Sequence, residues 1–192
     1  MEKRFYMNGE FFVQASFIPV LYIVVPCYNE EEVLPESSKT FLSKLKELIT
    51  EKEISDDSRI LFVNDGSKDR TWELIQQIHV LDYHFAGLSL SRNRGHQNAV
   101  LAGLMTVKDH ADISISIDAD LQDDINVINQ MIKKYKEGAQ IVYGVRNART
   151  TDSFFKRFTA ESFYRLMQMM GVELVFNHAD YRLMTKTALE AL

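Results

Sequence analysis

Apolar residues recur along the chain with two different spacings, one typical of buried strands and one typical of helices. Short continuous apolar runs rich in β-branched residues predict strands that are buried on both faces. Between these runs, apolar residues return every three or four positions among charged residues, which predicts helices with one packed side. The predicted strands are Leu21–Val25, Ile60–Val63, the segment around Leu88 and Leu90, Ile113–Ile117 and Ile141–Tyr143. The predicted helices cover 41–49, Thr71–Leu81, Gln97–Val107, 125–135 and Phe154–Met170.

The order of these elements predicts the fold class. Strands that alternate with helices of about a dozen residues form βαβ units, so we expect an α/β, Rossmann-like, mainly parallel sheet flanked by helices. A chain of 192 residues is long enough for one domain with a well-buried core. Residues Thr185–Leu192 have the pattern of a helix that begins without a cap, so the chain is expected to be a fragment of a longer protein.

Polar residues follow each predicted strand. They occupy positions 26–30, 64–69, 92–96, 118–124 and 144–147 and include acids, amides and arginines. Parallel sheets bind ligands at the carboxyl ends of their strands, so these clusters predict one polar site above an apolar sheet.

The cluster after the fourth strand has the clearest chemistry. Asp118 and Asp120 stand two residues apart as the strand ends, and Gln122 offers a further oxygen. Oxygen ligands without nearby His or Cys favour Mg²⁺ or Mn²⁺, which can stabilise a departing phosphate as a Lewis acid. The alternative is that the two aspartates only cap a helix or form a turn. Their place after a buried strand, among other polar strand ends, favours the metal site.

The cluster after the second strand predicts a contact to a nucleoside base. The Asp65 carboxylate can accept the N3–H of uracil or the N1–H of guanine, whereas adenine has no such ring donor. A uridine or guanosine nucleotide is therefore favoured over an adenosine one. The alternative is a tight Asp-Gly turn with Asp69 as the cap of the next helix.

Basic residues at the other strand ends could bind anions. Arginines pair well with diphosphate oxygens or with an anionic acceptor, although each one alone is equally at home on a solvated surface. His96, at the start of a predicted helix, is either a cap or a phosphate contact. The arginines concerned are Arg92, Arg94, Arg146 and Arg149.

Composition and missing motifs exclude several classes of protein. The chain has 22 Lys and Arg against 27 Asp and Glu, a net charge of −5, which does not suit nonspecific nucleic-acid binding. It has one cysteine, so no internal disulfide can form. The sequence contains neither a P-loop nor a Gly-x-Gly-x-x-Gly motif. The longest apolar stretch, Phe17–Pro26, is too short to span a bilayer, and no secretion signal is visible, which predicts a cytoplasmic domain.

Together these motifs resemble the inverting family 2 glycosyltransferases of GT-A fold. The resemblance rests on three stretches: 26–30 (PCYNE), 64–71 (NDGSKDRT) and 118–120 (DAD). Three others, 92–97 (RNRGHQ), 118–123 (DADLQD) and 178–184 (HADYRLM), are similar to the polyprenyl-phosphate branch, which includes bactoprenol glycosyltransferases and dolichyl-phosphate mannose synthase. The resemblance covers about residues 19–192. One departure is Asp124-Ile125, where that branch often has Pro-Pro.

The resemblance implies roles for particular residues. Those expected to bind the nucleotide are Pro26, Tyr28, Glu30, Asp65, Arg92 and Asp118. Those expected to hold the metal, Mg²⁺ or Mn²⁺, and the diphosphate are Asp118, Asp120 and Gln122. Asp180 would be the acceptor-side carboxylate. The residues expected to be catalytic are Asp120, Asp180 and Arg182. Those expected to bind phosphate or acceptor are Arg94, His96, Arg146 and Arg149.

The resemblance also implies a function and a domain organisation. We expect a leader (1–18) and a catalytic domain (19–192) that stops before C-terminal membrane helices, at the inner face of the cell membrane. The expected reaction moves glucose or N-acetylglucosamine from a UDP-sugar to polyprenyl (undecaprenyl) phosphate. The alternatives are a family 2 transferase that uses a sugar or polysaccharide hydroxyl, and a catalytically silent nucleotide-binding scaffold. The sequence is compatible with a homo-oligomer and leaves UDP against GDP open.

Overall fold

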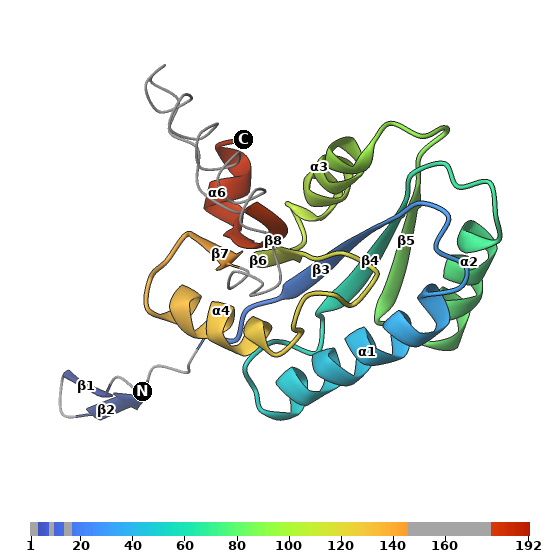
Figure 1. Ribbon diagram of the computed structural model, residues 1–192. Helices are drawn as coiled ribbons and strands as arrows, with labels where there is room; N and C mark the ends of the chain where they lie inside the picture. Colours follow the sequence, from blue (N-terminus) through green and yellow to red (C-terminus); the bar gives the residue numbers. More distant parts are fainter. Residues whose placement is uncertain (1–3, 8–9, 14–16, 146–177) are drawn as a thin grey trace, which may run out of the picture.

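The computed structural model describes residues 4–7, 10–13, 17–145 and 178–192 of the chain. Within the expected leader, β1 (Arg4–Met7) and β2 (Glu10–Val13) pair as an antiparallel hairpin. The main sheet has six strands in the order β5-β4-β3-β6-β8-β7 (Figure 1). Its strands are β3 (Leu21–Cys27), β4 (Arg59–Asn64), β5 (Phe85–Ser89), β6 (Ile113–Ser116), β7 (Ile141–Val145) and β8 (His178–Thr185). The helices are α1 (Leu34–Thr50), α2 (Thr71–Leu81), α3 (His96–Val107), α4 (Val127–Lys136) and α6 (Lys186–Glu190).

The predicted elements that fall in the described part of the chain are confirmed, with differences at their ends. The strand expected around Leu88 and Leu90 begins earlier, and Leu90 lies beyond its last residue. The helix expected after position 185 forms, but it is not uncapped, because the Thr185 hydroxyl accepts a hydrogen bond from the Ala188 N–H. The helix predicted over Phe154–Met170 lies outside the described residues.

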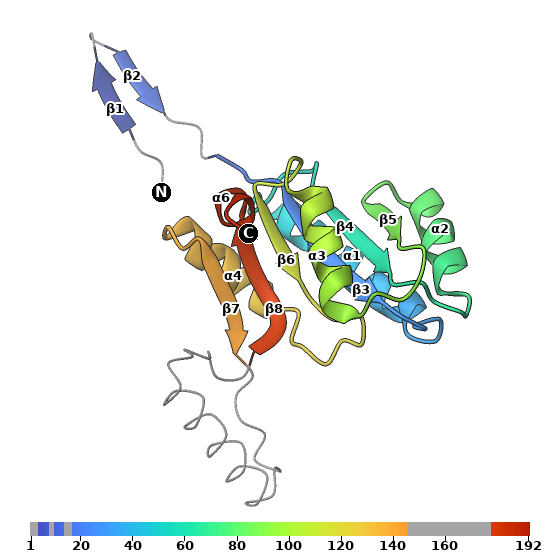
Figure 2. The ribbon, with the colours of Figure 1, turned by 90° about the horizontal axis from the view of Figure 1, so that it is seen from above.

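Strand directions place most of the polar clusters at one edge of the sheet. β3 pairs in parallel with β4 and β6, and β4 pairs in parallel with β5. β8 runs antiparallel between β6 and β7 (Figure 2), so its first residues lie at the edge where the other strands end. β8 was not among the strands predicted from the sequence.

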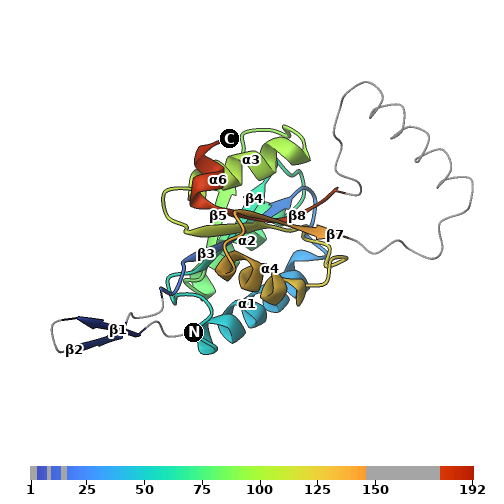
Figure 3. The same cartoon turned by 90° about the vertical axis from the view of Figure 1, so that its left-hand side faces the viewer.

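Helices cover both faces of the sheet, as Figure 3 shows in edge-on view. α1, α2 and α4 lie on one face, and α3 and α6 on the other. Successive strand residues point to opposite faces, so the odd-numbered residues of β3 pack towards α1 while Val24 packs towards α3. Burial on both faces explains why the strands consist of continuous apolar runs rather than alternating ones.

The chain reverses its direction of travel across the sheet at β3. It passes from β3 to β4 and β5, then returns through α3 to β6 on the other side of β3. Such a switch point leaves a crevice at the carboxyl ends of the central strands. Among the residues described, no helix is long and apolar enough to cross a membrane.

Candidate active site

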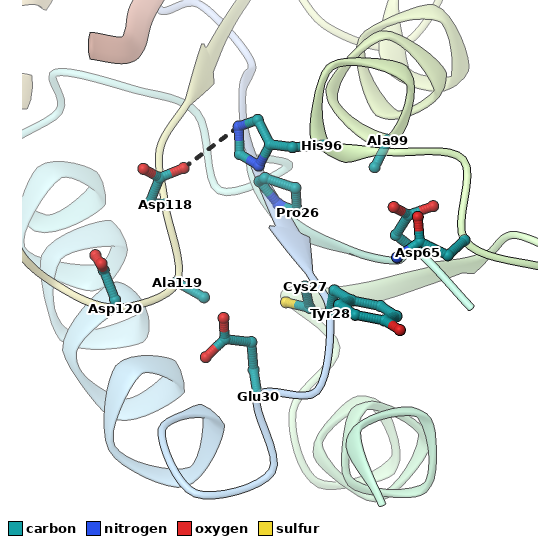
Figure 4. A pocket seen from close by; sticks show the side chains of 11 residues that line it. Pro26, Cys27, Tyr28, Glu30, Asp65, His96, Ala99, Asp118, Ala119 and Asp120 are labelled. Carbon is teal, nitrogen blue, oxygen red and sulfur yellow. Dashed lines mark ion pairs between the residues drawn. The ribbon is translucent and has the colours of Figure 1, made fainter. Parts of the chain in front are cut away.

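A cavity of about 310 Å³ lies at the carboxyl ends of the central strands (Figure 4). Its walls come from the end of β3 and the residues after it, from the segments that follow β4 and β6, and from the loop and first turn of α3. The residues that line it are Pro26, Cys27, Tyr28, Glu30, Asp65, Asn93, His96, Ala99, Asp118, Ala119 and Asp120. The fold thus brings four of the predicted strand-end clusters to one cavity.

The segment after β3 contributes an aromatic ring and a carboxylate. Pro26 and Cys27 are buried at the end of β3, whereas Tyr28 is 39% exposed and lines the cavity. Burial, followed by the charges of Asp120, Asp69 and Asp118, raises the pKa of the Glu30 carboxyl above its usual range. A cation bound among these carboxylates would relieve this repulsion.

The segment after β6 carries the predicted metal ligands. Asp118 Oδ1 lies 3.6 Å from His96 Nε2, so an imidazole from α3 faces this carboxylate across the cavity. Asp120 is exposed, and its Oδ1 accepts the backbone N–H of Gln122 at 3.0 Å. Asp120 therefore does form the turn considered as an alternative, while its carboxylate also lines the cavity. Gln122 is exposed and is not among the lining residues.

The residues present fit a divalent ion that also binds substrate. No group of three His, Cys, Asp or Glu within the described ranges is arranged to hold a metal by itself. Mg²⁺ usually takes only one or two carboxylates, and substrate phosphates and waters complete its shell. Asp118 and Asp120 both line the cavity and are the candidates for such a pair. Burial is the main cause of the raised pKa of Glu30, and the charges of these two carboxylates add to it.

Asp65 is buried and bonded within the protein. It is 3% exposed, and its two carboxylate oxygens accept the backbone N–H groups of Arg94 at 2.7 Å and Gly95 at 2.9 Å. Asp69 Oδ1 accepts from the backbone N–H of Thr71, the first residue of α2, at 3.0 Å. The N-cap position of α2 is Arg70, however, so Asp69 is not the helix cap considered as an alternative. Asp65 also lines the cavity, so its carboxylate can contact a ligand there as well as the backbone of the loop before α3.

The predicted basic residues do not all reach the cavity. His96 lines it, whereas Arg92 and Arg94 are exposed in the preceding loop and are absent from the lining. Arg146 and Arg149 lie outside the described residues.

The last predicted motif lies on β8, next to the strand that leads to Asp118. Arg182 pairs with Ser116, the last residue of β6. Continuing this register by two residues would place the backbone of Asp180 level with that of Asp118. The structure describes Asp180 through its backbone, which lies in β8. The Arg182 Nε is buried and has no hydrogen-bond partner among the described groups. A buried guanidinium nitrogen of this kind is an expected contact for an anion.

A contact from β8 holds the backbone at Asp124. The Tyr181 hydroxyl donates to the Asp124 backbone carbonyl at 3.2 Å and so ties β8 to the loop after β6. Burial, followed by the charges of Asp123 and Asp124, raises the pKa of Tyr181, which keeps this phenol a donor.

Four lining residues were not among the predicted site residues: Cys27, Asn93, Ala99 and Ala119. Asn93 stood within a quoted cluster, so its amide was a visible signal. Ala99 and Ala119 carried no signal, because a small apolar residue in a helix or loop is most often packing.

A cavity at the switch point of an open α/β sheet is where such proteins bind their ligands, and this one is lined by carboxylates and an aromatic residue. The chain belongs to glycosyl transferase family 2, whose family model matches residues 22–192. It is 58% identical over 174 residues to the uncharacterized glycosyltransferase YkoT of Bacillus subtilis, covering 91% of this chain and 52% of that protein. It is 42% identical over 171 residues to a prophage bactoprenol glucosyl transferase homolog of Escherichia coli, covering 88% and 53%. The chain spans about half the length of the curated relatives it matches.

Solved structures share the fold at low sequence identity. The glucosyl-3-phosphoglycerate synthase of Mycobacterium tuberculosis, solved with UDP, superposes with a TM-score of 0.59 at 15% identity, over 88% of this chain and 57% of that one. A mannosyltransferase from Pyrobaculum calidifontis, solved with GDP-Man and Mn²⁺, gives 0.56 at 18% identity, over 92% and 47%. The predicted GT-A fold is thus confirmed.

Proposed function

We propose that the protein containing this chain transfers a sugar from a UDP-sugar to polyprenyl phosphate, with inversion at the anomeric carbon. The observation that carries the proposal is the acidic cavity at the switch point of a chain 42% identical to a bactoprenol glucosyl transferase homolog. In this reaction an oxygen of the acceptor phosphate forms a bond to the anomeric carbon. The bond from that carbon to the diphosphate breaks on the opposite side, and UDP leaves.

The nucleoside would lie along the segments after β3 and β4. Pro26, Tyr28 and Glu30 would border it, and Asp65 would accept the base N–H. Each Asp65 oxygen accepts one backbone N–H and keeps a second lone pair. The carboxylate can therefore accept the one N–H that uracil presents on this edge or the two that guanine presents.

Asp118 and Asp120 would hold Mg²⁺ or Mn²⁺, with Gln122 able to add an oxygen after a side-chain movement. The ion, when bound, supplies Lewis-acid stabilisation of the leaving diphosphate. His96 would keep Asp118 oriented, since the two side chains already face each other at 3.6 Å. Arg92 and Arg94 would bind phosphate oxygens from the loop before α3, and Arg146 and Arg149 are proposed to do the same on the acceptor side.

Asp180 and Arg182 would act on the acceptor. Because a phosphate monoester has its second pKa near about 6, the acceptor is already largely an anion at pH 7 and needs little proton removal. Asp180 would therefore orient the acceptor or Arg182, and Arg182, with its unsatisfied Nε, would bind phosphate. A lipid acceptor also supports membrane attachment at the cytoplasmic face, through segments outside this chain, with residues 1–18 as a leader and 19–192 as the catalytic domain.

A screen of the full-length protein tests the proposal. UDP-glucose, UDP-N-acetylglucosamine and GDP-mannose are each offered with Mn²⁺ or Mg²⁺ and a short polyprenyl phosphate, and EDTA serves as the metal-free control. We expect a glycosylated lipid phosphate with a UDP-sugar, and none in EDTA. Transfer to a free sugar or polysaccharide hydroxyl, with none to the lipid phosphate, would contradict the acceptor. UDP binding without transfer to any acceptor would support a silent nucleotide-binding scaffold instead.

A further inference from the structure

The loop between β5 and α3 is exposed, yet the segment after β4 fixes its backbone. Residues 91–98 are all exposed. The loop carries Asn93 to the cavity wall and leads directly into His96, which also lines the cavity. The position of this loop therefore decides where two lining residues stand.

Asp65 provides the main polar attachment for the loop. Its two oxygens accept the backbone N–H groups of consecutive residues, Arg94 and Gly95, at 2.7 and 2.9 Å. Asp65 is 3% exposed, so these bonds to a charged acceptor are partly shielded from water. A hydrogen bond to a buried charged group is stronger than an average one, and leaving that group without partners is unfavourable.

Gly66 provides the matching steric contact. Its φ is +65°, a conformation that glycine tolerates best. A Cβ at this position would overlap the carbonyl carbon of Arg92 and would lie 2.5 Å from the amide nitrogen of Asn93. The loop backbone therefore rests directly on Gly66, next to the carboxylate that holds it.

We propose that Asp65 is a positioning residue that, with Gly66, fixes the loop 92–95 and so holds Asn93 and His96 in place before a nucleotide arrives. This deepens the proposed function, since it adds to the expected contact between Asp65 and the base. It explains why a carboxylate beside the cavity directs both oxygens to the protein's own backbone. A rigid, preformed wall spares the ligand the entropy of ordering the loop.

Limited trypsin digestion of the full-length protein tests the positioning role without any substrate. Trypsin cleaves after Arg92 and Arg94, and cleavage requires local opening of the loop. We expect Asp65→Asn to speed cleavage at these two bonds at least about tenfold, the change that corresponds to losing a hydrogen bond to a charged group. Gly66→Ala, which keeps the carboxylate and displaces the same backbone, should speed it as well.

Two controls separate this effect from general unfolding. Lys52 is an exposed cleavage site in the turn after α1, and its cleavage rate should not change. Asp69→Asn alters a neighbouring carboxylate that accepts from Glu31 and Thr71 rather than from the loop, and should leave cleavage at Arg92 and Arg94 unchanged. Unchanged loop cleavage in Asp65→Asn would overturn the proposal, as would an equal rise at Lys52.

Nucleotide binding provides the second measurement. If Asp65 positions the loop, both Asp65→Asn and Gly66→Ala should lower the affinity for UDP. Gly66→Ala should still bind UDP more tightly than ADP. Loss of that preference in Asp65→Asn, with loop cleavage unchanged, would show a base contact alone and refute positioning. A protein that binds no nucleotide would refute the proposed function, yet the digestion would still decide the role of Asp65.

Discussion

Asp120→Asn separates the charge of this residue from its structural role. Asp120 Oδ1 accepts the Gln122 N–H at 3.0 Å, and an asparagine side chain keeps an oxygen that can do the same. The turn after β6 should therefore survive. What the substitution removes is one negative charge from a cavity that also holds Glu30 and Asp118.

The loss of this charge has opposite effects with and without a metal ion. Without the ion, the carboxylates repel a diphosphate, by about 1 kcal/mol for two charges about 4 Å apart in water and more at a partly buried site. Asp120→Asn should then bind UDP as tightly as the parent or up to about fivefold more tightly. With Mn²⁺, loss of a direct ligand should lower the transfer rate by more than the roughly 10- to 100-fold typical of groups that only support a ligand.

Calorimetric titration of UDP in EDTA and in Mn²⁺, together with transfer assays, measures both effects. Asp124→Asn is a matched control, because Asp124 is exposed in the same loop and its Oδ1 accepts the Asn126 N–H at 2.9 Å in the same way. Asp124 does not line the cavity, so Asp124→Asn should bind UDP as tightly as the parent protein does. Near-normal transfer by Asp120→Asn, or full parent activity in EDTA, would refute the metal assignment.

Three further predictions follow from other contacts. Gly103→Ala should lower the free energy of unfolding by about 1–3 kcal/mol in urea denaturation, because its Cβ would overlap Val24 Cγ1 and lie 2.8 Å from Val63 Cγ2; a more stable variant would show that α3 can shift. Glu30→Gln should raise the Tm at pH 7.5 and not at pH 4. The pKa of Glu30 is raised in the folded state, so its ionisation destabilises the fold as the pH rises above about 4.5. An equal gain in Tm at both pH values would exclude this cause. Asp180→Asn should keep measurable transfer with a rate that no longer rises above about pH 7, whereas tenfold recovery per pH unit would indicate a hydroxyl acceptor.

Local sequence was sufficient to predict five of the six strands of the main sheet, the helices between them and the edge of the sheet that carries the site. The apolar runs at 21–25, 60–63 and 113–117 can only be buried from both sides, which requires helices on two faces. Parallel strands end at the same edge, so the residues that follow them had to gather there. For this reason Asp118 and Glu30 could be placed in one site without knowing the strand order.

Only the tertiary structure decided which of these groups meet. β8 enters the sheet antiparallel between β6 and β7, and nothing in its periodicity reports the direction of its neighbours. The bonds from Arg94 and Gly95 to Asp65 join residues about thirty positions apart, and His96 meets Asp118 only because α3 crosses back over β3. Such contacts depend on where the chain returns, a long-range property, whereas hydrophobic spacing records only whether each residue is buried.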